Sequence, residues 1–150
     1  MAPSGCGVCL LHESGEARAQ YEIARTPLWI LRHHPDPAPL EAWLLLDARR
    51  HLSGPMEFNS DEASTWGFAM KHASKLVQDL SGCDRVYAIA FGEGARHLHM
   101  HLIPRFGNQT NTEAWRIADL YRAVAASQQP AADPQRVAAL VQQGRFLWRA

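Results

Sequence analysis

The sequence lacks three features that would each place the protein in a broad class. No stretch approaches the roughly 20 consecutive apolar residues that a membrane-spanning helix needs. Lys+Arg and Asp+Glu balance at 15 each, so the chain lacks the basic excess expected of a protein that binds nucleic-acid polymers. No basic segment followed by an apolar one opens the chain, so a signal peptide is not expected. These absences favour a cytoplasmic protein with neither a membrane nor a nucleic-acid polymer as partner.

Cysteine is also scarce, and the number of cysteines is odd. The three are Cys6, Cys9 and Cys83. Without an export signal we expect a reducing environment, in which disulfides are disfavoured. With 150 residues, of which 47% are hydrophobic, the chain has the size and composition of one globular domain with a sizeable core.

Hydrophobic periodicity predicts strands, one long helix, further strands and then two helices. The expected strands are "TPLWILRHH", "EAWLLLDARR", "RVYAIAFG" and "HLHMHLIPR", and a glycine turn joins the last two as an antiparallel hairpin. The long helix is "NSDEASTWGFAMKHASKLVQDLSG", with Asn59 or Ser60 as its N-cap and Gly82 at its end. Two more helices are expected in "TNTEAWRIADLYRAVAAS" and "DPQRVAALVQQG", whereas "MAPSGCGVCLLHESGEARA" is expected to be irregular. This order favours an α+β domain with an antiparallel sheet.

One segment, "RHLHMHLIPR" from Arg96 to Arg105, alternates histidine with apolar residues. Alternate side chains of a strand share one face, so the three histidines are expected on one face and the apolar residues on the core side. The histidines are His97, His99 and His101. Two chemical interpretations remain open. Imidazoles at this spacing can bind one metal ion, or one of them can act as a nucleophile that attacks phosphorus, since imidazole is largely neutral at pH 7.

A second cluster has the spacing of metal ligands. Cys6 and Cys9 form a C-x-x-C pair, which is half of many structural zinc sites. A redox C-x-x-C is the alternative, but that motif normally follows a strand and only five residues precede Cys6. Two more ligands are needed, and the candidates are His51, after an apolar strand, and His97, at the start of the histidine strand. We therefore predict a Cys2His2 zinc site.

The histidine segment resembles the signature of the histidine triad family, His-φ-His-φ-His-φ-φ with φ apolar. Every position from His97 to Ile103 matches, and the resemblance extends over roughly Cys6 to Phe106. "CGVC", "RRH" and the triad together resemble the zinc-containing members, in which two Cys, a His after a strand and the first triad His hold the metal. The resemblance implies an antiparallel sheet of about five strands with a long helix. It places the histidine triad domain in residues 1–106 and a C-terminal helical extension, packed on that domain, in residues 107–150.

The resemblance also implies an activity. Such proteins are hydrolases or nucleotidyltransferases that act at the α-phosphate of dinucleoside polyphosphates or nucleotide phosphoramidates, through a nucleotidyl-histidine intermediate. His99 would be the nucleophile, and His101 would hydrogen-bond a phosphate oxygen. A structural Zn²⁺ would be held by Cys6, Cys9, His51 and His97. The nucleotide would meet Gly92, Gly94, Arg96 and His34, and two copies would form a homodimer. The third triad histidine, where uridylyltransferase-type relatives carry Gln, favours hydrolysis over nucleotide exchange.

Departures from the family pattern keep other functions open. Gly92 lies near a slot that often holds Asn, and Ala95 and Arg96 precede the triad where Ser or Gln is common. A nucleotide-binding or regulatory protein with little turnover is therefore the alternative. A third hypothesis is a catalytic zinc held by all three triad histidines. Among the remaining histidines, His12 and His72 are expected at the surface.

Overall fold

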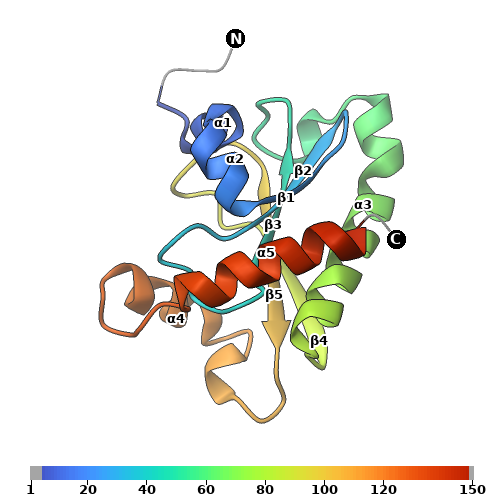
Figure 1. Ribbon diagram of the computed structural model, residues 1–150. Coiled ribbons are helices and arrows are strands. Elements are labelled where there is room, and N and C mark those ends of the chain that lie inside the picture. The colour runs from blue at the N-terminus through green and yellow to red at the C-terminus, as the bar shows by residue number, and fades with distance from the viewer. Residues whose placement is uncertain (1–4, 149–150) are drawn as a thin grey trace.

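The computed structural model describes residues 5–148, which form one five-stranded sheet with helices packed around it (Figure 1). The strand order is β1-β2-β3-β5-β4, and every neighbouring pair is antiparallel. The strands are β1 (Glu22–Arg25), β2 (Trp29–His33), β3 (Leu44–Ala48), β4 (Arg85–Ile89) and β5 (His99–Arg105). The α+β class, the antiparallel sheet of five strands and the C-terminal helices predicted from the sequence are confirmed.

The long helix α3 (Ser60–Ser81) begins and ends where the sequence predicts. Asn59 is its N-cap: the Asn59 side chain accepts from the Glu62 N–H and the Glu62 carboxylate accepts from the Asn59 N–H, both at 2.9 Å. Gly82 ends the helix in the left-handed region, with φ 69°, which costs glycine no steric strain. The buried side of α3 carries Ala73, Leu76 and Val77.

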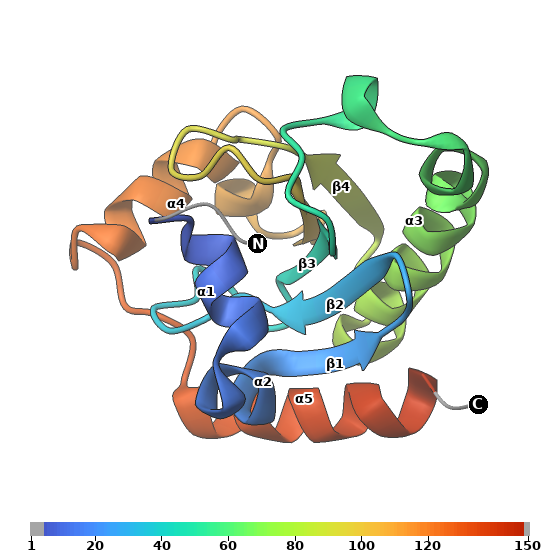
Figure 2. The ribbon, with the colours of Figure 1, turned by 90° about the horizontal axis from the view of Figure 1, so that it is seen from above.

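The sheet has a core face and a histidine face. On the core face, side chains of β2, β3 and β5 pack against α3 and against α5 (Pro134–Trp148) in the main hydrophobic cluster. Figure 2 shows α5 running beside β1, and the Arg145 Nε–H donates to the Glu22 carbonyl at 2.9 Å. The helix α4 (Ile117–Ala125) lies on the other side of the sheet from α3 (Figure 2), where Ile117 packs with Trp43 and Ile103.

The N-terminal segment is helical, so the expectation of an irregular start is wrong. It forms α1 (Gly7–Glu13) and α2 (Gly15–Tyr21). The Cys6 sulfur accepts from the Cys9 N–H at the start of α1, and the Ser14 hydroxyl accepts from the Ala17 N–H at the start of α2. These helices depend on caps and on tertiary contacts rather than on a long apolar stripe, which explains why periodicity does not reveal them. Residues 1–4 of the segment lie outside the described residues.

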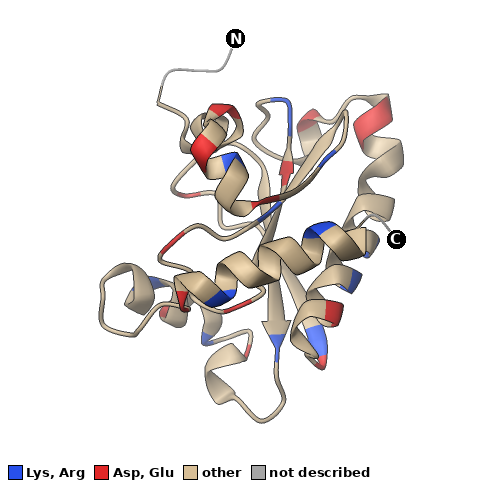
Figure 3. Cartoon of the chain, viewed as in Figure 1, with Lys and Arg blue, Asp and Glu red and all other residues tan. Residues whose placement is uncertain are grey.

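The described chain also contains two short 3₁₀ helices, η1 (Pro55–Glu57) and η2 (Thr110–Thr112). Basic and acidic residues are interspersed over the elements drawn in Figure 3, and the net charge is zero. Within residues 5–148, none of the helices combines the length and the apolar character needed to cross a membrane.

Candidate functional site

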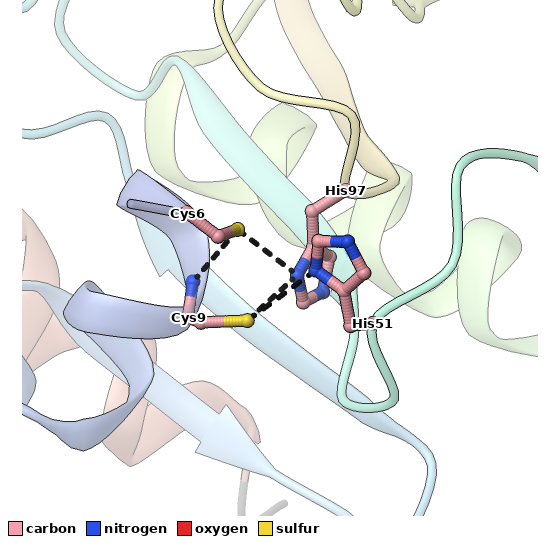
Figure 4. A group of neighbouring side chains, drawn as sticks. All are labelled: Cys6, Cys9, His51 and His97. Carbon is pink, nitrogen blue, oxygen red and sulfur yellow. Dashed lines mark hydrogen bonds between the residues drawn. The ribbon is translucent and has the colours of Figure 1, made fainter. Parts of the chain in front are cut away.

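Four predicted metal ligands meet between α1 and two loops. Their ligand atoms all lie within 4.8 Å of one another and come from Cys6, Cys9, His51 and His97 (Figure 4). Both cysteines belong to the start of α1, His51 follows β3, and His97 precedes β5. The C-x-x-C spacing brings the two sulfurs together because Cys6 caps the helix while Cys9 sits in its first turn.

The distances in this cluster fit a tetrahedral ion. The Cys6 Sγ lies 3.7 Å from His97 Nδ1, and the Cys9 Sγ lies 3.3 Å from the same nitrogen. The Cys9 Sγ lies 3.5 Å from His51 Nδ1. Sulfur and nitrogen ligands on a tetrahedral zinc are about 3.6 Å apart, given ordinary zinc–ligand bond lengths. The cluster can therefore bind a metal ion, and its donor set is one that zinc prefers.

The His97 ring is already oriented toward such an ion. Its Nε2–H donates to the Ala48 carbonyl at 2.6 Å, so Nδ1 carries the lone pair that faces the two sulfurs. His97 is 1% exposed, and the pKa of this ring is lowered, chiefly by burial. A buried neutral imidazole with one nitrogen fixed on a carbonyl is the usual form of a zinc-binding histidine.

His99 and His101 lie apart from the metal cluster, on the histidine face of β5. Their register partners on β3 are Asp47 and Leu45. The His99 Nδ1–H donates to the His97 carbonyl at 2.6 Å, which leaves His99 Nε2 with a lone pair. Among residues 5–148 the His99 Nε2 has no hydrogen-bond partner, so the lone pair is available for chemistry.

His101 is the more deeply buried of the two rings. It is 2% exposed, and its ring centroid lies 5.3 Å from that of His99. Its Nδ1 accepts from the Trp43 indole N–H at 2.9 Å. Burial lowers the pKa of His101 to about 3, and the nearby His99 and His34 add to this effect. His101 is therefore uncharged at neutral pH.

Of the residues predicted to meet a nucleotide, one lies beside His101 and the other three lie in the loop that leads into β5. His34 follows β2, and its ring centroid lies 6.2 Å from that of His101; burial lowers its pKa to about 4. Gly92 and Gly94 belong to the loop between β4 and β5, and an added Cβ would meet open space at both positions. Gly92 has φ 68°, so it supplies a left-handed turn there. Arg96 is exposed at the end of the same loop.

A buried ionic group on the histidine face was not anticipated from the sequence. Asp47 is fully buried on β3, and its carboxylate accepts from Arg32 Nε–H at 2.6 Å and lies 2.7 Å from His12 Nε2. Burial alone would raise the pKa of Asp47, but Arg32 and His12 outweigh it and lower that pKa. The expectation of a surface His12 is therefore wrong, because Asp47 holds its side chain at 9% exposure. The sequence does carry a sign of this pair. The strands β2 and β3 are largely apolar, and each contains one charged residue, Arg32 in β2 and Asp47 in β3.

Replacement of Asp47 by Asn is expected to destabilise the protein by about 3 kcal/mol, because it leaves the Arg32 guanidinium buried without a carboxylate. Chemical denaturation at pH 7 measures this cost. The matched control is Asp79→Asn, in the exposed Lys75–Asp79 pair, which should cost less than about 0.5 kcal/mol. Because the Asp47 pKa is lowered in the folded state, its contribution is complete above its ordinary pKa of about 4 and is lost as the pH falls through the folded-state value. Equal stability losses for the two variants at pH 7 would contradict the prediction.

Comparison with solved structures identifies the fold. A zinc-bound histidine triad family protein from Mycobacterium smegmatis matches with a TM-score of 0.68 and 12% identity, over 97% of this chain and 96% of that one. A hypothetical histidine triad nucleotide-binding protein from Sulfolobus tokodaii matches with a TM-score of 0.68 and 15% identity, over 96% and 92% of the two chains. A histidine triad protein from Bradyrhizobium japonicum matches with a TM-score of 0.63 and 19% identity, over 89% and 94%.

At the level of sequence no protein-family model matches the chain, and no curated protein matches it. The structural matches nevertheless extend along nearly the whole chain. The protein therefore has the histidine triad fold, and it carries in that fold a Cys2His2 cluster able to bind a metal ion.

Proposed function

We propose that this protein is a zinc-containing member of the histidine triad family. In this proposal it hydrolyses dinucleoside polyphosphates or nucleotide phosphoramidates at the α-phosphate. The observation that carries the proposal is the orientation of His99, whose Nδ1–H donates to the His97 carbonyl, so that Nε2 is the ring nitrogen left for a lone pair. A neutral imidazole held in this way is a nucleophile that needs no separate base.

The reaction proceeds in two displacements. In the first, His99 Nε2 forms a bond to the α-phosphorus, and the bond from phosphorus to the leaving oxygen or nitrogen breaks. The leaving group departs with that electron pair and takes up a proton from solvent. The positive charge that develops on the His99 ring is stabilised by its Nδ1–H bond to the His97 carbonyl. In the second displacement a water oxygen attacks phosphorus and the P–N bond breaks, so that its electron pair returns to His99 Nε2. The attacking water gives up a proton to solvent, and the nucleoside monophosphate leaves.

His101 and the loop before β5 are placed in supporting roles. His101 adjoins His99 and is uncharged, so it can donate a hydrogen bond to a phosphate oxygen as a neutral ring. Backbone amides around Gly92 and Gly94 are assigned to the phosphates because their loop leads into the triad, and His34 is assigned to the ribose or base because it lies beside His101.

Zinc, when bound, is proposed to be structural. The ion would be held by Cys6, Cys9, His51 and His97, and four protein ligands leave no open position for a substrate. By joining α1 to the loops before β5 and after β3, the cluster fixes the start of the triad strand, and with it the carbonyl that orients His99. The chemistry at phosphorus is assigned to the side chains.

A substrate panel tests the activity. Purified protein is incubated separately with ApppA, AppppA and an AMP phosphoramidate, and release of AMP is followed by chromatography. We expect AMP from at least one of the three substrates. Binding of AMP without product from any of them would instead favour the alternative of a nucleotide-binding or regulatory protein.

Three further parts of the proposal rest on the sequence and on the family resemblance that it carries. They are a homodimer, a cytoplasmic location, and the division into a histidine triad domain of residues 1–106 and a helical extension of residues 107–150. Light scattering in solution measures the first directly.

A further inference from the structure

The three triad histidines each have one ring nitrogen committed to a fixed partner. His97 and His99 each donate to a backbone carbonyl, at 2.6 Å in both cases. His101 differs, because its partner is the Trp43 indole N–H at 2.9 Å. An indole N–H only donates, so His101 Nδ1 must accept and cannot carry a proton in this contact. A neutral His101 therefore bears its proton on Nε2.

Trp43 is held rigidly enough to impose this choice. It is fully buried and immediately precedes β3. Its carbonyl accepts from the His34 N–H at 2.8 Å. The preceding residue, Ala42, has φ 63° and donates its N–H to His33 Nε2 at 3.0 Å. His33 is itself buried on the core side of the sheet, so this turn has little freedom to release the indole.

Aromatic rings enclose the same imidazole on its other sides. The centroid of the Phe91 ring lies 5.0 Å from that of His101, and Tyr121 of α4 lies 5.7 Å from it. Within residues 5–148 neither of these rings hydrogen-bonds a nitrogen of His101, and together with Trp43 they limit the access of water to it. Trp43 is therefore the group that selects the tautomer of His101 in this enclosure.

We propose that Trp43 is a positioning residue that holds His101 as an Nε2–H hydrogen-bond donor. His99 and His101 then carry opposite tautomers, one presenting a lone pair at Nε2 and the other an N–H at Nε2. Such a pair suits one phosphoryl group, because the lone pair meets phosphorus while the N–H meets an oxygen bound to it. The role in catalysis rests on the proposed function, whereas the tautomer is a property of the protein alone.

Imidazole ¹⁵N NMR of the zinc-loaded protein tests the tautomer without any substrate. We expect the His101 signals of the wild type to show a protonated Nε2 and an unprotonated Nδ1. In Trp43→Phe, which keeps an aromatic ring but lacks the N–H, we expect a mixture of tautomers. Replacement of Trp43 by β-(3-benzothienyl)alanine, which keeps the indole shape without the N–H, should give the same mixture and controls for a packing defect.

Steady-state kinetics test the role in the reaction, with Trp29→Phe as the control. Trp29 is also buried, and its indole N–H donates to Thr65 rather than to a histidine. We expect kcat to fall about tenfold in Trp43→Phe with little change in KM, and to stay near the wild-type value in Trp29→Phe.

The NMR and kinetic experiments together distinguish failure of the tautomer assignment from failure of the proposed function. A wild-type His101 protonated on Nδ1 would overturn the proposal, and so would equal kcat values for Trp43→Phe and Trp29→Phe. If the wild type hydrolyses none of the nucleotide substrates, the proposed function fails, while the NMR spectra still uphold or overturn the assignment of the tautomer to Trp43.

Discussion

Replacement of His99 by alanine is expected to reduce turnover by about 10⁴-fold or more, because it removes the proposed nucleophile rather than a supporting contact. The zinc content should remain near one ion per chain, since the His99 ring takes no part in the Cys2His2 cluster. AMP release from the best substrate of the panel measures the first quantity, and metal analysis of the same preparation measures the second.

The combination of the two measurements is what discriminates between hypotheses. If a catalytic zinc were held by all three triad histidines, His99→Ala would lose metal and activity together. The matched control is His72→Ala, an exposed histidine on α3, which should keep both. Activity in His99→Ala comparable with that of the control would rule out His99 as the nucleophile.

Replacement of Cys9 by serine is expected to abolish stoichiometric metal binding. The Cys9 sulfur is buried and lies 3.3 Å from His97 Nδ1 and 3.5 Å from His51 Nδ1, so it is central to the cluster. Loss of a structural metal is among the few single changes that destabilise a domain by about 4 kcal/mol or more. We therefore expect a large drop in the denaturation midpoint, together with the metal loss measured by mass spectrometry.

Cys83 provides the control for this variant. It is buried in the main hydrophobic cluster, away from the four metal ligands. Cys83→Ser should lose some packing energy, on the order of 1 kcal/mol, and should keep its zinc. A Cys9→Ser protein that retained one zinc per chain would show that the ion binds elsewhere.

Local patterns were sufficient to predict much of this fold. The Asn59 cap, the apolar side of the long helix and the terminal Gly82 are all encoded within one segment, so α3 was predictable almost to the residue. The alternation of the histidine segment was equally informative, and Leu98, Met100 and Leu102 do pack in the main cluster. The pairing of two cysteines with two distant histidines could be proposed because ligand chemistry restricts the choice of partners.

Contacts between distant segments were not predictable in this way. Trp43 and His101 are 58 residues apart, and nothing in either segment marks the indole N–H as the partner of that imidazole. The same holds for His12, which is 35 residues from Asp47. The strand β1 was missed because its four residues form an edge strand with a register shift, too short for periodicity to indicate.

The position of α5 limits where a strand from another molecule can pair with the sheet. Because α5 runs beside β1 and Arg145 occupies a carbonyl of that strand, this border of the sheet is covered. At the opposite border, β4 has no further strand beside it among residues 5–148. Strand addition from a second molecule is thus confined to one border. Two copies joined there would each have only a covered border left, so the assembly would stop at a pair and would not extend into a fibre.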